Sequence, residues 1–459
     1  MTTRIALEVI SQVKKPYILY QSIKARQKSF VIGSIITIVL NGLSIFVSSI
    51  TSILVARALG PQELGYLILF MTGTNTISLF ADVMGIHYSN AYLIASNNHN
   101  VALPTVRGTV LFYGIIVGLF TGSIFGLISP LRLLIFHGFD APTWGVLIGF
   151  SVLGLSLLSQ VRGLFLGHSN FLMLGALGLF QPLLYSILFL GTTYMLGWRT
   201  GVQVAMMYLV ATWVCVAGAL IFLMHRGIAR PSFRYIKACA QVGWRAAITN
   251  WLSFLQLRVD QYLVNWLLGP VALGFYGVAV SCGEFLTRVP GMLGSVIFPL
   301  VAAEKNNTLM ARITLRRCGL VMAFVGLLSV PMGVFAQSLI GCLYGSAFTP
   351  SVQALQFLLP AVIFMSGLLI VDNHLAGLGY PVMKIISLLI SLAINVLGNL
   401  ILLPKLGIIG ASVTSSFSYL IWLLLVTGYL WLIAHKPVSE AQGGDVIIRH
   451  HTLIEIERD

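Results

Sequence analysis

The stretch Leu54–Gly65 reads LVARALGPQELG, and the stretch Leu263–Gly274 reads LVNWLLGPVALG. Seven positions are identical, at an offset of 209 from Leu54 to Leu263. In each copy a Gly-Pro pair separates two long apolar runs. Such a pair favours a tight turn because glycine tolerates positive φ and proline has no N–H group to leave unpaired. The motif therefore predicts a duplicated unit, with chance similarity between two short stretches as the alternative.

The composition places the chain in a membrane. Of its 459 residues, 58% are hydrophobic and 9% are charged, and the mean hydropathy is +0.93. A soluble domain carries about 25% charged residues. Apolar runs of about 20 residues, each long enough to cross a bilayer as a helix, recur along the whole sequence. This pattern excludes a soluble enzyme, and it excludes a transmembrane barrel because barrel strands alternate apolar and polar positions.

Turn residues between the apolar runs predict twelve spans, and so an all-α multi-pass membrane protein. The first six are expected at about Ser29–Leu54, Leu64–Ile86, Thr109–Ile128, Trp144–Leu166, Phe171–Leu196 and Val202–Met224. The other six are expected at about Ala246–Leu268, Phe275–Leu300, Gly319–Ile340, Leu355–Leu378, Val382–Leu403 and Ile409–Ile433.

The repeat divides these spans into two six-helix lobes. The predicted organisation is a basic segment 1–28, a lobe 29–224, a basic linker 225–245, a second lobe 246–433 and a tail 434–459. An even number of spans per lobe gives both lobes the same orientation, so a pseudo-twofold axis along the membrane normal and a cavity between the lobes are expected. This is the architecture of an alternating-access transporter.

Basic residues predict the orientation. The formal net charge is +14, which in a soluble protein would suggest a nucleic-acid partner. Here, however, 21 of the 27 Lys and Arg fall in segments on the side of the N-terminus and only four in segments on the other. Cytoplasmic loops hold such an excess, so both termini are expected in the cytoplasm, beside anionic lipid, with no nucleic-acid partner. The basic stretches Ile10–Phe30 and Pro231–Arg245 are interpreted either as interfacial helices or as plain connectors.

Several kinds of site are missing from the sequence. The five cysteines are scattered without a Cys-x-x-Cys pair, which argues against a disulfide framework or a metal site. There is no Walker phosphate loop, and no outer loop is long enough for a glycosyltransferase or ligase site. We therefore expect neither a cofactor nor an enzymatic activity.

Four stretches resemble one family. The first is ARALGPQELGY at Ala56–Tyr66, which resembles the first outer turn of Wzx-type oligosaccharide flippases. These are polysaccharide transporters of the multidrug/oligosaccharidyl-lipid/polysaccharide (MOP) superfamily. Further stretches similar to signatures of the same family are Arg258–Tyr276, Arg162–Gly167 and Asn395–Ser412.

The resemblance implies a MATE-like, two-lobed flippase of the bacterial inner membrane. It would move a polyprenyl-pyrophosphate-linked oligosaccharide to the periplasmic leaflet for O-antigen or exopolysaccharide synthesis, driven by an H⁺ or Na⁺ gradient. Other polysaccharide assembly proteins are candidate partners. A drug or metabolite antiporter of the same fold is the alternative function.

Four charged residues inside predicted spans are the principal candidates for this work. Arg258 and Asp260 lie in span seven, and Glu284 and Arg288 lie in span eight. A charge inside a bilayer is costly and usually faces a cavity or a partner. The arginines suit a substrate pyrophosphate because the guanidinium group matches phosphate oxygens. Asp260 or Glu284 would then bind the coupling cation; the alternative is an ion-pair network that only joins the two spans.

Five further polar residues are secondary candidates. Asp82 and Asp372 lie near inner ends of spans, where they can be gate residues or solvated helix-end residues. Asn41, Asn75 and Asn395 lie within spans, where an amide can bind sugar hydroxyls or a neighbouring helix.

Overall fold

The computed structural model describes residues 2–95, 101–168, 170–303 and 307–435, and in these ranges the regular structure is all helical. Ten of the helices described there are long and apolar enough to cross a membrane. The chain is therefore an all-α, multi-pass integral membrane protein, as the apolar runs predict. The predicted tail 434–459 lies, beyond residue 435, outside the described residues.

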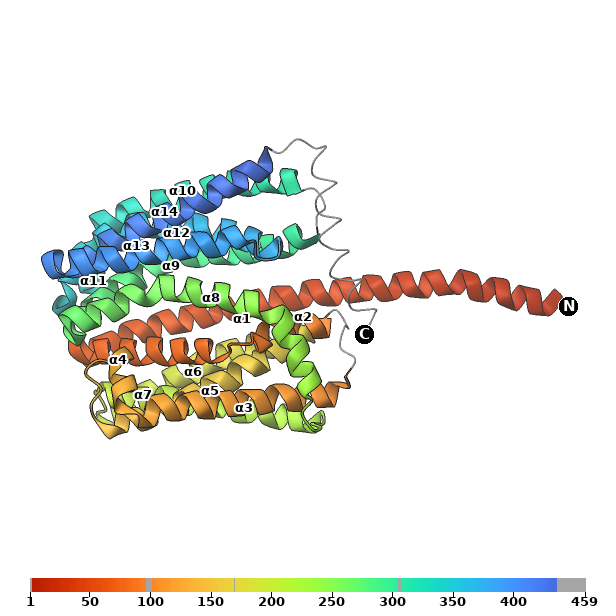
Figure 1. Cartoon of the computed structure of the whole chain (residues 1–459), viewed down its shortest axis with the longest axis horizontal. Coiled ribbons are helices and arrows are strands. Elements are labelled where there is room, and N and C mark those ends of the chain that lie inside the picture. The colour runs from red at the N-terminus through yellow and green to blue at the C-terminus, as the bar shows by residue number, and fades with distance from the viewer. Residues whose placement is uncertain (1, 96–100, 169, 304–306, 436–459) are drawn as a thin grey trace. The chain divides into compact units, whose positions relative to one another are not determined.

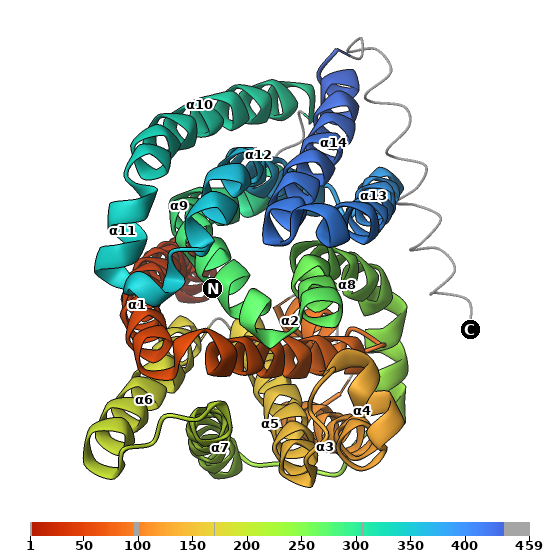
Figure 2. The same cartoon turned by 90° about the vertical axis from the view of Figure 1, so that its left-hand side faces the viewer.

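The helices are shown in Figures 1 and 2. In chain order they are α1 (Thr2–Ala81), α2 (Ile86–Ala95), α3 (Leu103–Leu127), α4 (Ser129–Ile135), α5 (Pro142–Gly167), α6 (Phe171–Leu196), α7 (Gly201–His225), α8 (Phe233–Leu268), α9 (Pro270–Ala303), α10 (Asn307–Val334), α11 (Ala336–Leu343), α12 (Ser351–Gly377), α13 (Val382–Leu406) and α14 (Ile408–Ala434), with a 3₁₀ turn at Ser346–Phe348.

The predicted spans map onto these helices. The span predicted at Phe171–Leu196 coincides with α6. Both spans predicted before residue 87 lie in the single helix α1, which is interrupted at Gly60 (φ 72°). The span predicted at Ala246–Leu268 is the second part of α8, which is too polar to be among the ten. Because α8 begins at Phe233, most of the basic stretch Pro231–Arg245 is helical and continuous with that span.

Several predicted boundaries differ from the helix ends, and three of the differences change where the chain turns. The second span does not reach Ile86, because the helix ends at Ala81 and the chain turns at Gly85 (φ 60°) before α2. The ninth does not begin at Gly319, because α10 extends back to Asn307 and α11 forms a separate helix. Pro404 does not end the eleventh span: it lies inside α13, and the turn is made at Gly407 (φ 60°).

The chain folds into two compact units. Unit 1 comprises Met1–Leu54, Ile77–Arg132 and Phe139–Trp244. Within it α5 packs against α2, α3 and α7, and α6 packs against α7. At the contact between α3 and α5, a Cβ atom on Gly122 would lie 2.6 Å from the carbonyl oxygen of Gly149, and one on Gly145 would lie 2.3 Å from that of Gly126. Two glycine pairs, each spaced by four residues, thus let the two backbones approach closely, as small residues do between membrane helices.

Unit 2 comprises Val55–Thr76, Leu133–Gly138 and Arg245–Asp459. Its centre is α12, which packs against α9, α10 and α14, while α13 packs against α14. The apolar core of this unit includes Val325 of α10, Val371 of α12 and Val426 of α14, each fully buried. The tight packing of α9, α12 and α14 positions the polar residues described below.

The two Gly-Pro turns of the repeat contact each other within unit 2. Gly60 (φ 72°) and Gly269 (φ 86°) both adopt the positive φ that the motif predicts. A Cβ atom on Gly65 would lie 1.8 Å from the carbonyl oxygen of Pro270, and one on Gly274 would lie 1.9 Å from that of Pro61. The contact is thus reciprocal between equivalent positions of the repeat, which supports a duplicated origin and explains why both positions are glycine.

This contact predicts that Gly274→Ala destabilises the protein. The added methyl group has to displace backbone at Pro61 and not a flexible side chain, so we expect a loss of about 1–3 kcal/mol in the free energy of unfolding. Gly218→Ala in α7 is the control, because nothing lies within 4 Å of its Cβ position. Thermal unfolding of the purified protein in detergent measures both; equal midpoints for the two variants would contradict the role of the turn contact.

Candidate functional site

Unit 2 contains a cavity of about 210 Å³ among α8, α9, α12 and α14. Apolar side chains such as Leu257, Val280 and Leu358 form part of its wall. Its polar or charged lining residues are Arg258, Asp260, Glu284, Thr287, Arg288 and Tyr419. All four principal candidates from the sequence therefore line one cavity.

The three charges on Arg258, Glu284 and Arg288 form a chain across α8 and α9. Arg258 Nη1 lies 2.8 Å from Glu284 Oε1, so this pair is a direct ion pair between the two helices. Arg288 Nη2 lies 3.9 Å from Glu284 Oε2, at the limit of an ion pair, and its side chain is 45% exposed. Two guanidinium groups thus share one carboxylate, and the Arg288 guanidinium is the less closely held of the two.

Asp260 is held by neutral donors. Its Oδ2 accepts hydrogen bonds from the Tyr276 hydroxyl (2.6 Å) and from Ser415 Oγ (3.1 Å), and its Oδ1 accepts one from the Gln261 N–H (2.8 Å). Only 3% of the residue is exposed. Arg258 and Asp260 are two residues apart and point to different partners, although they interact electrostatically. The carboxylate is therefore stabilised without a direct ion pair.

A buried polar network continues from Asp260 along α13 and α14. Ser418 Oγ donates to the carbonyl oxygen of Ser415 (3.1 Å) and accepts from Gln256 Nε2 (3.2 Å) and Asn395 Nδ2 (3.3 Å). Asn395 Oδ1 in turn accepts from Asn399 Nδ2 (2.6 Å). Gln256 Oε1 and Asn399 Oδ1 are buried acceptors without a hydrogen-bond partner among the described residues. The network thus ends in side-chain oxygens that have unused lone pairs.

The sequence indicates Asn395 as a candidate, but not Gln256, Ser415 or Ser418 of this network. The available signal is the hydroxyl-rich stretch Ser412–Ser418, in which Ser412, Ser415 and Ser418 recur every three residues. Such a spacing puts hydroxyl groups on one helix face.

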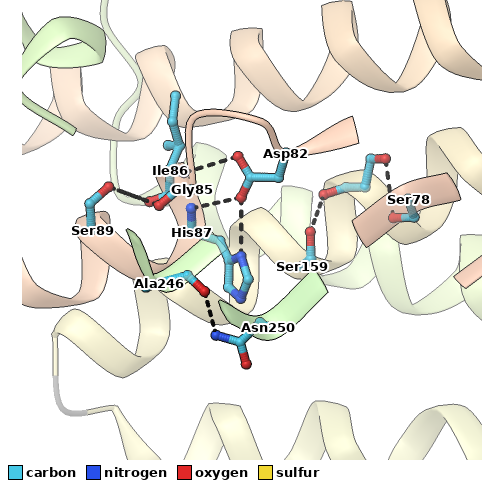
Figure 3. A network of polar contacts seen from close by, with 10 residues as sticks. Ser78, Asp82, Gly85, Ile86, His87, Ser89, Ser159, Ala246 and Asn250 are labelled. Carbon is cyan, nitrogen blue, oxygen red and sulfur yellow. Dashed lines mark hydrogen bonds and ion pairs between the residues drawn. The ribbon is translucent and has the colours of Figure 1, made fainter. Parts of the chain in front are cut away.

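Asp82 lies in the turn between α1 and α2, in unit 1 (Figure 3). Its Oδ1 accepts from the Ile86 N–H (2.9 Å), and its Oδ2 accepts from the His87 N–H (3.2 Å) and lies 3.1 Å from His87 Nδ1. Burial raises the pKa of this carboxyl, but the hydrogen bonds and charge of His87 and the N–H group of Ile86 lower it further, so the pKa lies below its ordinary value. Asp82 thus stays ionised at neutral pH and caps the start of α2.

The other secondary candidates lie outside the cavity lining. Asp372 Oδ1 pairs with Lys384 Nζ at 2.9 Å, and Lys384 is only 3% exposed. Asn75 Nδ2 donates to the carbonyl oxygen of Met71 in its own helix (2.7 Å). Asn41 is an exposed residue of α1.

Known proteins place the fold and the family. A family model described as "Polysaccharide biosynthesis protein" matches residues 54–353. A curated relative, "Probable low-salt glycan biosynthesis flippase Agl15" of Haloferax volcanii, is 24% identical over 209 residues, which are 44% of this chain and 43% of that protein. The matched region thus spans less than half of the relative.

Solved structures share the fold. An inward-facing MATE-family multidrug resistance transporter of the MOP superfamily matches with a TM-score of 0.69 at 13% identity, over 89% of this chain and 99% of that one. The lipid II flippase MurJ in an inward closed conformation matches with a TM-score of 0.70 at 14% identity, over 90% and 89% of the two chains. The predicted MATE-like fold is confirmed, and the solved structures that share it are described as a multidrug transporter of the MOP superfamily and a lipid II flippase.

The contacts of Asp260 predict that Tyr276→Phe destabilises unit 2. The substitution removes one donor from a buried carboxylate, and a hydrogen bond to a charged group contributes about 1.5–3 kcal/mol to the free energy of unfolding. Tyr429→Phe is the matched control, because Tyr429 is a partly buried tyrosine of α14. Thermal unfolding measures both variants, and a Tyr276→Phe midpoint no lower than that of the control would contradict this assignment.

Proposed function

Because the chain belongs to the polysaccharide biosynthesis protein family, we propose that it is a flippase for a polyprenyl-pyrophosphate-linked oligosaccharide. The observation that carries the proposal is the pair Arg258 and Arg288, which share one carboxylate on the wall of a largely apolar cavity. A lipid-linked glycan combines an anionic pyrophosphate with an apolar chain, and this lining suits both parts.

In this function the two arginines have different tasks. Glu284 fixes the Arg258 guanidinium through a 2.8 Å ion pair. Arg288, held more loosely at 3.9 Å, keeps donors available for pyrophosphate oxygens, which a guanidinium group can bind in a bidentate manner. An antiporter for cationic drugs would instead need carboxylates that face an organic cation. Here Glu284 is already paired with Arg258, and Asp260 is hydrogen-bonded and only 3% exposed.

Asp260 suits the coupling cation. With Asp260 and Glu284 ionised, the two acids balance the two arginines that line the cavity. An H⁺ or Na⁺ on Asp260 therefore leaves the lining with one net positive charge, which strengthens binding of an anion. The neutral donors around Asp260 and the unused oxygens of Gln256 and Asn399 support a cation at this carboxylate. Cation and substrate would thus be coupled by charge.

We further propose alternating access between two lobes, cytoplasmic termini, a bacterial inner membrane, a role in O-antigen or exopolysaccharide synthesis and contact with other assembly proteins. The excess of basic residues on one side of the predicted spans supports the orientation. The relative from Haloferax volcanii is archaeal, so the class of organism rests on the resemblance alone.

A leaflet assay tests the arginine assignment. Purified protein is reconstituted in liposomes with a labelled polyprenyl-pyrophosphate oligosaccharide, and label exposed to an outside probe is followed under an imposed H⁺ or Na⁺ gradient. We expect Arg288→Gln to lower the rate of exposure at least about tenfold, because it removes a charge-assisted contact to the phosphate. Arg317→Gln, at an exposed arginine of α10, is the control with the same loss of charge.

Two outcomes would redirect the assignment. Exposure that survives in Arg288→Gln would make the charge cluster a structural ion-pair network. No exposure with any donor lipid, together with gradient-driven uptake of a cationic dye, would favour the antiporter.

Coupling of cation and substrate by charge also predicts the behaviour of Asp260→Asn. The neutral amide mimics the protonated acid, so we expect pyrophosphate binding to persist while label exposure loses its dependence on the gradient. Binding is measured by calorimetry in detergent and exposure in the same liposomes. Gradient dependence equal to that of the wild type would exclude Asp260 as the coupling site.

A further inference from the structure

Arg162 of α5 is a cation inside unit 1 that points away from the end of its helix. Its Nη2 donates to Gln181 Oε1 at 3.1 Å. Gln181 follows Phe171, the first residue of α6, by ten positions, which is about 15 Å along the helix axis. An arginine near a helix end normally extends toward water. Arg162, although only five residues from the end of α5, extends back into the helix bundle instead.

The acceptor of this bond is itself held in place. Gln181 Nε2 donates to Thr212 Oγ1 (3.0 Å), and Thr212 Oγ1 donates to the carbonyl oxygen of Tyr208 (2.9 Å). Because the amide nitrogen of Gln181 is used by Thr212, its oxygen faces the guanidinium. Gln181 and Thr212 are buried, whereas Arg162 is partly accessible. Gln181 therefore fixes one edge of the Arg162 guanidinium through Nη2, and the other N–H donors of this group have no acceptor among the described residues.

No carboxylate of the described residues neutralises Arg162. The acids of unit 1 with described side chains are Asp82, which is bound to His87, and Asp140, which is exposed. Neither forms an ion pair with Arg162. An unpaired charge at the centre of a membrane helix costs about 2.5–3.5 kcal/mol on insertion scales, so a cation that extends into the bundle without a carboxylate partner indicates a function.

Two other arginines of unit 1 have a structural role, which is evident from their hydrogen-bond acceptors. Arg132 donates to the carbonyl oxygens of Gly126 (2.8 Å), Phe139 (3.1 Å) and Asp140 (3.4 Å). Arg107 Nη1 donates to the carbonyl oxygens of Arg226 and Gly227. Both tie a helix to a neighbouring turn. Arg162 donates to no backbone carbonyl oxygen of the described residues and so differs from both.

The second half of the repeat shows that the fold needs no charge at this position. Leu166-Gly167 aligns with Leu378-Gly379 at an offset of 212, which places Arg162 opposite His374. His374 is fully buried, and its Nδ1 hydrogen-bonds to Thr314 Oγ1 at 2.8 Å. An uncharged hydrogen-bonding side chain is enough there.

We propose that Arg162, oriented by Gln181, binds a phosphate group within unit 1. The guanidinium supplies two or more parallel N–H donors to phosphate oxygens, and the bound anion neutralises the otherwise unpaired charge. The ligand class is a phosphate ester or diphosphate, either on a lipid or free in solution. The site lies in unit 1 and does not depend on the role given to Arg258 and Arg288.

The test uses the full chain in a maltoside detergent, with Arg258→Gln and Arg288→Gln introduced first so that the unit 2 cavity cannot contribute. Binding of inorganic pyrophosphate, a polyprenyl phosphate and phosphatidylglycerol is measured separately by calorimetry and native mass spectrometry. We expect at least one of the three to bind saturably, and Arg162→Gln to weaken it about tenfold or more. Arg234→Gln, at an exposed arginine of α8, is the matched control and should leave binding unchanged.

The arms separate the sources of phosphate. Binding of pyrophosphate alone indicates a free anion, binding of the polyprenyl phosphate alone a carrier lipid, and binding of phosphatidylglycerol alone a bilayer lipid. Binding that is equal with and without Arg162, or no binding in any arm, would overturn the proposal. Because the background lacks both arginines of the unit 2 cavity, either result is independent of the leaflet assay.

A second variant covers the case in which Arg162→Gln does not fold. Gln181→Glu keeps the arginine and gives it an internal carboxylate, while the Thr212 hydroxyl can donate to the new acid. We expect a higher thermal midpoint without ligand and the same loss of phosphate binding. Unchanged binding in Gln181→Glu would also overturn the proposal.

Discussion

The high cost of an unpaired charge in a bilayer is the constraint on which the polar structure of this chain depends. Of its 459 residues only 9% are charged, so each ionic group within the helices has a specific arrangement around it. Three arrangements occur. Glu284 and Asp372 form ion pairs with basic side chains. Arg132 is bound by backbone carbonyl oxygens at the ends of helices. Asp260 is bound by neutral hydroxyl and amide groups.

These arrangements differ in what an arriving ion can change. An ion pair already cancels its own charge, and an arginine bound by several carbonyl oxygens has few donors left. A charged group held by neutral partners keeps its net charge and can still attract an ion of opposite sign. Asp260 and Arg162 are both of this third type, one an acid in unit 2 and the other a base in unit 1. Sensitivity to ligands is therefore expected at these two residues before any other.

The sequence predicted most of the fold because its determinants are local. Apolar runs define the spans, and positive φ confines the sharp turns at Gly60 and Gly269 to glycine. Features that depend on contacts between distant segments were missed. Arg162 is one of the 21 basic residues predicted on the side of the N-terminus, because it lies near the end of a span, and nothing local signals that its side chain extends toward Gln181. The sequence indicates all four charges in spans seven and eight. It does not indicate that three of them form an ion-paired group while Asp260 is hydrogen-bonded separately, because one of its donors, Ser415, lies on α14, more than 100 residues away.

The two halves of the repeat have the same residues where two backbones touch, and they differ at the positions of their charged side chains. The Gly-Pro turns are similar because Gly65 and Gly274 each lie against the backbone of the other copy, and any side chain there would collide with it. At the equivalent positions Arg162 and His374 no backbone contact enforces identity, and one half carries a cation while the other carries a buried imidazole. The intramembrane charges of α8 and α9 likewise have no counterparts in the first copy: 209 positions earlier, Ser49, Thr51, Asn75 and Leu79 stand in place of Arg258, Asp260, Glu284 and Arg288. A duplicated scaffold of this kind supplies matched helices and turns, and we expect the binding properties of its two halves to differ where their charges are unmatched.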